Sequence, residues 1–122
     1  MNVIKESNAV TAKVTVISLW SKCEGVRGHE NNATYEVEVP AGGDHIQTLE
    51  RAFARTNQDD RPKGHEVCST SSGDILVLDG RHYLVENSGY HELTLTESEM
   101  VQKLTSRDTS LGFDFMAKNH LL

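Results

Sequence analysis

The sequence predicts an α+β fold: a mostly antiparallel sheet of five to six strands, with one main helix at about residues 45–56 packed on one face and a short second helix at about 97–104. Three observations predict it. Short runs of β-branched residues are separated by glycine turns, two stretches with helical spacing follow capping residues, and no internal repeat is present. We expect a single domain spanning residues 1–122, long enough to bury a core.

The first two strands differ in their pattern. Residues 11–20 are rich in Val, Ile and Thr without clean alternation, which predicts a central strand that is buried on both faces. Residues 34–39 alternate strictly, which predicts a strand with one packed side and one solvent-facing side. The packed side holds Tyr35, Val37 and Val39, and the other side holds Thr34, Glu36 and Glu38.

The main helix has a clear start. Residues 40–43, a proline, an alanine and two glycines, end the preceding strand, and Asp44 stands at the N-cap position with Gln47 three residues later, which is a capping-box arrangement. Apolar residues then follow at helical spacing, so we expect the helix to pack through one narrow stripe. The stripe consists of Ile46, Leu49, Ala52 and Phe53.

Three further strands form a predicted meander. Residues 75–78 are aliphatic, and Asp79-Gly80 favours a type I′ turn, in which both central residues have positive φ. Residues 81–86 return antiparallel, and the turn at 87–89 leads into a last strand that begins at Tyr90.

The C-terminal part is predicted less completely. Residues 96–99, Thr-Glu-Ser-Glu, form a second predicted capping box for a short helix that buries Met100, Val101 and Leu104. Residues 105–122 fit either a closing strand or a docking tail. The alternation of Leu111, Phe113 and Phe115 is compatible with both, and Phe113, Phe115 and Met116 could dock on a second copy of the chain, making a homo-oligomer, as easily as on their own sheet.

Charge and composition exclude several functions. The net charge is -6, with 18 acidic and 12 basic residues dispersed along the chain, which argues against nonspecific binding to nucleic acid. Two cysteines do not make a disulfide framework, and no apolar stretch is long enough for a membrane span. The start of the chain lacks the order of a signal peptide. We therefore expect a soluble, cytoplasmic protein without membrane contact.

Catalytic and metal signals are weak. Cys23, His29, His65 and Cys68 could make a structural zinc site, but their C-x5-H and H-x2-C spacing favours unrelated loop residues. A nucleophilic Cys68 would need His65, His82 or His91 as its base, and no nucleophile signature surrounds it. We expect neither a cofactor nor an enzyme.

A basic cluster is the strongest binding signal. Arg51 and Arg55 are separated by one helical turn, and Arg61 and Lys63 follow just beyond the helix. Together they could grip a phosphate or a carboxylate. Salt bridges with neighbouring acids are the alternative; these acids are Glu50, Asp59 and Asp60.

The Ser-rich loop that follows is a second binding signal. Its hydroxyl and backbone N–H groups could cradle a phosphate, although the P-loop pattern is absent and a strand follows it. The alternative is a turn that only leads into the strand. The residues in question are Ser69, Ser71, Gly73 and Asp74.

One stretch carries a joint pattern that covers about half of the chain. It comprises YEVEV from Tyr35, a helix before Asn57, DDRP with a following glycine, Gly73-Asp74 before ILVL, and YLVENSGY. This pattern resembles the YodL-like group of small proteins of bacteria, phages and mobile elements. The sequence departs from the group at residues 66–69, where the group tends to place Arg-Ser.

The resemblance implies a compact α+β module without an established reaction and supplies no catalytic residues. We therefore expect a non-catalytic binding protein, a phage or mobile-element accessory protein that binds and inhibits a host protein such as a defence component. The alternative is a protein that sequesters a nucleotide or another small phosphorylated ligand through the basic cluster and the Ser-Gly-Asp loop.

Overall fold

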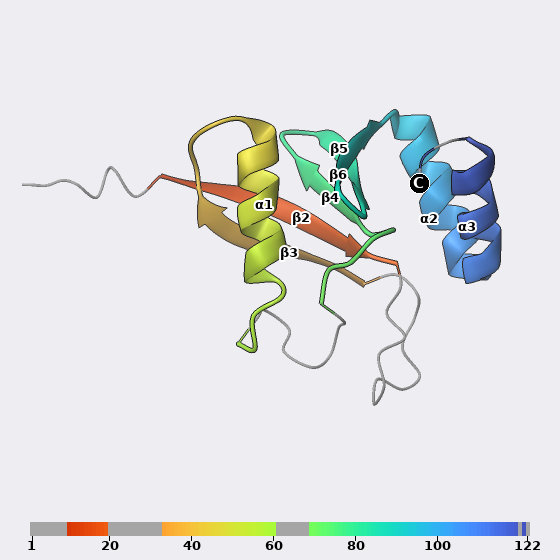
Figure 1. Ribbon diagram of the computed structural model, residues 1–122, viewed down its shortest axis with the longest axis horizontal. Coiled ribbons are helices and arrows are strands. Elements are labelled where there is room, and N and C mark those ends of the chain that lie inside the picture. Colours follow the sequence, from red (N-terminus) through yellow and green to blue (C-terminus); the bar gives the residue numbers. More distant parts are fainter. Residues whose placement is uncertain (1–9, 20–32, 61–68, 120, 122) are drawn as a thin grey trace, which may run out of the picture.

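The computed structural model describes residues 10–19, 33–60, 69–119 and 121 (Figure 1). These residues form an α+β fold, with a five-stranded antiparallel sheet in the order β3-β2-β4-β5-β6 and three helices. The strands are β2 (Thr11–Ser18), β3 (Ala33–Pro40), β4 (Ile75–Leu78), β5 (Arg81–Glu86) and β6 (Gly89–Leu93). The helices are α1 (His45–Arg55), α2 (Leu95–Arg107) and α3 (Thr109–Lys118).

The helices cover opposite faces of the sheet. One apolar cluster joins α1 to Val16, Tyr83 and Val85, and the other joins α2 and α3 to strand residues that point the other way, such as Leu84. Figure 1 shows α1 crossing β2 and β3, while α2 and α3 lie together at the opposite end of the molecule. Helix α1 on one face and the α2–α3 pair on the other are therefore offset from each other along the sheet.

Strand β2 lies between β3 and β4, which confirms the predicted central strand. Its burial is uneven, however. Val14 and Val16 are buried on the α1 side, and Ile17 is buried on the other side, but Lys13 is exposed. The second face of β2 is thus covered only near the end of the strand, because α2, on which α3 packs, contacts β5 and β6.

The predicted meander and its first turn are confirmed. Strands β4, β5 and β6 pair consecutively in antiparallel register. Asp79 and Gly80 have φ of 54° and 76°, the positive values that a type I′ turn requires. The second hairpin closes at the pair Glu86–Gly89, so its loop consists of Asn87 and Ser88.

The start of α1 is confirmed, but part of its predicted stripe is wrong. Asp44 and Gln47 form the expected reciprocal capping box. Leu49 is fully buried, whereas Ile46 is 41% exposed and Thr48 is buried in its place. Thr48 tolerates this position because its hydroxyl donates to the Asp44 carbonyl, at 3.3 Å.

The second capping box is displaced by two residues from its predicted position. The N-cap of α2 is Thr94, whose side chain accepts from Glu97 N at 3.0 Å, and Glu97 Oε1 accepts from Thr94 N at 2.9 Å. Thr94 follows the last residue of β6 and keeps the extended backbone that an N-cap needs. Thr96 therefore lies inside the helix.

The predicted closing strand in residues 105–122 is wrong, because this segment forms the end of α2 and helix α3. Among the α3 residues whose burial is described, Gly112 and Met116 are buried and lie four residues apart, while Leu111 and Phe113 are exposed. Burial thus follows the helical period and not the two-residue alternation. Within the described residues, no helix is both long enough and apolar enough to cross a membrane.

Candidate functional site

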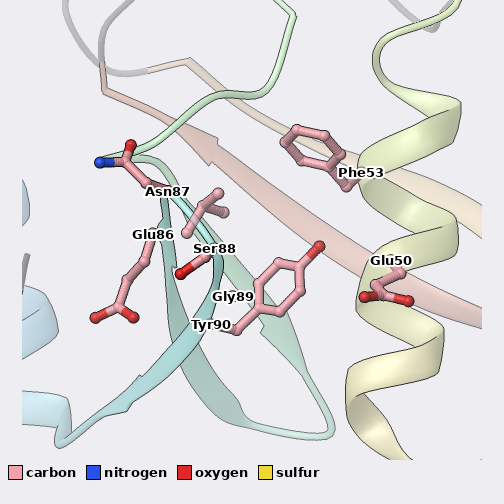
Figure 2. Close-up of a pocket in the computed structure, with 8 residues that line it drawn as sticks. Glu50, Phe53, Glu86, Asn87, Ser88, Gly89 and Tyr90 are labelled. Atoms are coloured by element: carbon pink, nitrogen blue, oxygen red, sulfur yellow. The ribbon is translucent and has the colours of Figure 1, made fainter.

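An open groove lies between α1 and the β5–β6 hairpin, while the main contacts of α1 are with β3, β2 and β4. It has a volume of about 340 Å³. We call it the hairpin groove; Figure 2 shows the residues that line it, which are Glu50, Phe53, Val85, Glu86, Asn87, Ser88, Gly89 and Tyr90.

Helix α1 supplies one wall of the hairpin groove. The buried residues Leu49 and Ala52 fix the rotation of the helix on the sheet. Glu50 and Phe53 are three residues apart and so share a neighbouring face of the helix, which is turned toward the hairpin (Figure 2). Glu50 is exposed and Phe53 is half-buried against the core.

The hairpin supplies the other wall. Tyr90 is paired with the buried Val85, and both belong to the α1 side of the sheet. The tight loop of Asn87 and Ser88 ends the hairpin beside the groove, and both residues are exposed. In Figure 2 the Tyr90 ring stands between the hairpin and α1, with its hydroxyl on the helix side. Two aromatic rings from separate elements therefore flank the opening.

The electrostatic character of the groove is negative. Burial raises the pKa of the Tyr90 hydroxyl, and the negative charge of Glu50 raises it further. None of the ion pairs within the described residues involves Glu50. Glu86 contributes little charge here, because its carboxylate points away from Phe53 and Tyr90 (Figure 2) and lies 3.9 Å from His91 Nδ1.

A second polar network, absent from the sequence predictions, joins the start of α1 to the β4–β5 turn. His45 Nδ1 lies 2.7 Å from the Tyr83 hydroxyl, and His45 Nε2 lies 3.0 Å from Asp79 Oδ2. Arg81 forms a two-pronged ion pair with Glu92, at 2.7 and 2.9 Å. Tyr83 is only 5% exposed, so this network serves to anchor α1. In the sequence, this network was indicated only by the N-cap signal at Asp44, next to His45, and by the separate turn signal at Asp79-Gly80.

The two described residues of the basic cluster are engaged within the chain. Arg51 donates to the carbonyls of Pro40, at 2.8 Å, and Gly42. Arg55 donates to the Asp60 carbonyl at 3.1 Å and lies 3.4 Å from the Asp60 carboxylate. Arg61 and Lys63 lie outside the described residues. Phosphate binding by the four bases therefore stays a prediction.

The Ser-Gly-Asp loop forms a junction between strands. Asp74 is buried, and its two carboxylate oxygens accept from Leu19 N at 2.8 Å and Ser71 N at 3.0 Å. Gly73 N donates to the Val85 carbonyl at 2.8 Å. Ser69 is half-buried and Ser71 is exposed. Asp74 thus directs its charge toward backbone N–H groups within the fold.

The four residues considered as an alternative zinc site, Cys23, His29, His65 and Cys68, all lie outside the described residues, and with them lies Cys68 as the nucleophile considered. The two described histidines considered as bases contact other groups: His82 Nδ1 lies 2.7 Å from the buried Ser98 hydroxyl, and His91 approaches Glu86. Among the described residues, no group of three or more His, Cys, Asp or Glu could hold a metal ion.

Comparisons with known proteins returned no matching family, no matching curated protein and no matching solved structure.

Proposed function

We propose that the protein is a non-catalytic binding protein that holds a protein partner in the hairpin groove. The observation that carries this proposal is the groove itself, an opening of about 340 Å³ flanked by Phe53 and Tyr90. Aromatic residues that keep one side exposed supply a large contact area at low entropic cost, and such residues dominate the energetics of protein interfaces.

The surroundings of the groove support a binding role. The hairpin is tied to the preceding loop, because Val85 N donates to the Asp74 carbonyl at 2.9 Å and Ser72 Oγ donates to Asn87 Oδ1 at 2.7 Å. On the other side, the bond from Arg51 to the Pro40 carbonyl of β3 and the contact of His45 with the Tyr83 hydroxyl of β5 tie α1 to the sheet. A preformed surface of this kind binds without a large ordering cost.

The identity of the partner is a finer part of the proposal. The resemblance of residues 35–93 to YodL-like proteins supports a phage or mobile-element accessory protein that binds and inhibits a host protein, such as a defence component. The net charge of -6 favours a partner with a basic surface.

The experiment compares three forms of the full chain as bait in a cell lysate. Tyr90→Ala removes one wall of the groove, and Phe113→Ala is the matched control, because it removes an aromatic ring that is 55% exposed on α3. We expect the wild-type chain and Phe113→Ala to retain the same protein in stoichiometric amount, and Tyr90→Ala to lose it. Recovery of no protein, or equal recovery by all three baits, would overturn the proposal.

A further inference from the structure

The hairpin groove combines aromatic walls with one negative charge. Glu50 lies on the same helical face as Phe53, and Figure 2 shows its carboxylate on the side of the helix that faces the Tyr90 ring across the groove. Among the residues that line the groove, none is basic. This arrangement has the chemistry of a cation site, with ring faces for stacking and a carboxylate as counter-ion.

We propose that the hairpin groove accepts an arginine side chain of the protein partner, with Glu50 as its counter-ion and the rings of Tyr90 and Phe53 as its walls. This inference rests on the proposed function and names the chemistry that the groove recognises. A guanidinium is planar and weakly hydrated, so it stacks on aromatic faces and donates in parallel to a carboxylate.

The size and the charge of the groove fit this occupant. A volume of about 340 Å³ is at the lower end of the range of about 300–1,000 Å³ for small-molecule pockets, and one long side chain can enter without displacing α1. Glu50 is exposed and has no ion-pair partner among the described residues, so none of the described cations competes with an incoming one for this carboxylate.

The rim offers polar groups at the tip of the hairpin. Ser88 is exposed at the groove, and the Asn87 amide oxygen already accepts from Ser72, which fixes its orientation. The hydroxyl of Ser88 and the phenol oxygen of Tyr90 can each accept a hydrogen bond from a guanidinium. Recognition would then combine charge, stacking and hydrogen bonds at one site.

The test uses two peptides that differ only in charge: Ac-Ala-Ala-Arg-Ala-Ala-amide and the same peptide with citrulline, the neutral isostere of arginine. Binding to the full chain is followed by NMR through the ring signals of Tyr90 and Phe53. We expect the arginine peptide to bind about tenfold more tightly than the citrulline peptide, a difference of about 1.4 kcal/mol.

Two variants show whether Glu50 causes this preference. Glu50→Gln should reduce it to about twofold, whereas the control Glu36→Gln, which removes an equal charge from the exposed side of β3, should keep it. Equal binding of the two peptides to the wild-type chain, the same preference in Glu50→Gln, or no saturable shift at millimolar peptide would overturn the inference. The proposed function would survive these results if Tyr90→Ala still lost the partner from the lysate.

Discussion

Asp74 was predicted to take part in ligand binding, and in the structure its side chain contacts backbone groups of the fold. Its carboxylate is buried and accepts hydrogen bonds from the backbone N–H groups of Leu19 and Ser71. Leu19 follows β2, and Ser71 precedes β4, so one side chain joins the ends of two paired strands. The Gly-Asp pair therefore marks a structural junction.

We expect Asp74→Ala to lower the free energy of unfolding by about 3 kcal/mol, because the buried Leu19 N–H loses a charged acceptor. Asp59→Ala is the matched control, since Asp59 is exposed after α1, and its effect should be within about 0.5 kcal/mol. Urea unfolding followed by circular dichroism measures both. Similar unfolding midpoints for the two variants would show that the junction does not stabilise the fold.

Tyr90 reports on the electrostatics of the groove. Burial raises the pKa of its hydroxyl, and Glu50 adds to this effect. Glu50→Gln should therefore lower the Tyr90 pKa toward its ordinary value, while Glu36→Gln leaves it unchanged. Because folding favours the neutral phenol, the contribution of Tyr90 to stability is present below the pKa of an unfolded tyrosine and is lost as the pH rises through the folded pKa. An NMR titration measures the Tyr90 pKa in each variant. An unchanged pKa in Glu50→Gln would show that the Glu50 charge does not act on the Tyr90 hydroxyl.

At the scale of the elements, the start of α2 shows how a strand end selects a cap. Thr94 and Thr96 both precede residues that suit a capping box, and local sequence does not separate them. Pairing of Leu93 with His82 keeps the chain extended up to Thr94, and the helix begins directly after it. The tertiary register therefore decides which threonine becomes the cap.

Thr94→Ala should cost about 1 kcal/mol of stability through the lost cap. Thr96→Ala should be neutral or slightly stabilising, because Thr96 is exposed inside the helix and alanine has the higher helix propensity. Chemical unfolding of the two variants makes the comparison. A larger loss in Thr96→Ala would contradict the assigned cap.

Helix α3 was missed because its sequence fits two periods. Leu111, Phe113 and Phe115 alternate as a strand would, yet Gly112 and Met116 are the buried residues. A β-carbon at Gly112 would lie within 3 Å of the Thr105 side chain, so the glycine permits the close approach of α3 to α2. This packing requirement becomes visible only when the two helices are placed together.

At the scale of the whole molecule, the sheet separates two apolar clusters, and α1 completes one of them. Leu49→Ala should cost about 2–5 kcal/mol, because the fully buried leucine leaves a cavity against the sheet. Ile46→Ala should cost about 1 kcal/mol or less, since Ile46 is 41% exposed. Thermal and urea unfolding would contradict the orientation of α1 if Ile46→Ala were the more damaging variant.

Most of the sheet could be predicted because its signals are local. Alternation predicted which residues of β3 are buried, Asp79-Gly80 predicted the turn between β4 and β5, and Asp44 predicted the start of α1. The hairpin groove could not be predicted, because it arises from the offset between α1 and the β5–β6 hairpin. The contacts of Arg51 were equally hidden, since backbone carbonyls such as that of Pro40 leave no sequence signal.

The most direct measurement of the central claim is photo-crosslinking of the full chain in its lysate. The residue p-benzoylphenylalanine replaces Ser88 at the groove rim in one form and Glu36 on the exposed side of β3 in the other. We predict a light-dependent adduct with the stoichiometric partner from position 88 and none from position 36. An adduct from position 36 alone, or none from position 88, would contradict binding through the hairpin groove.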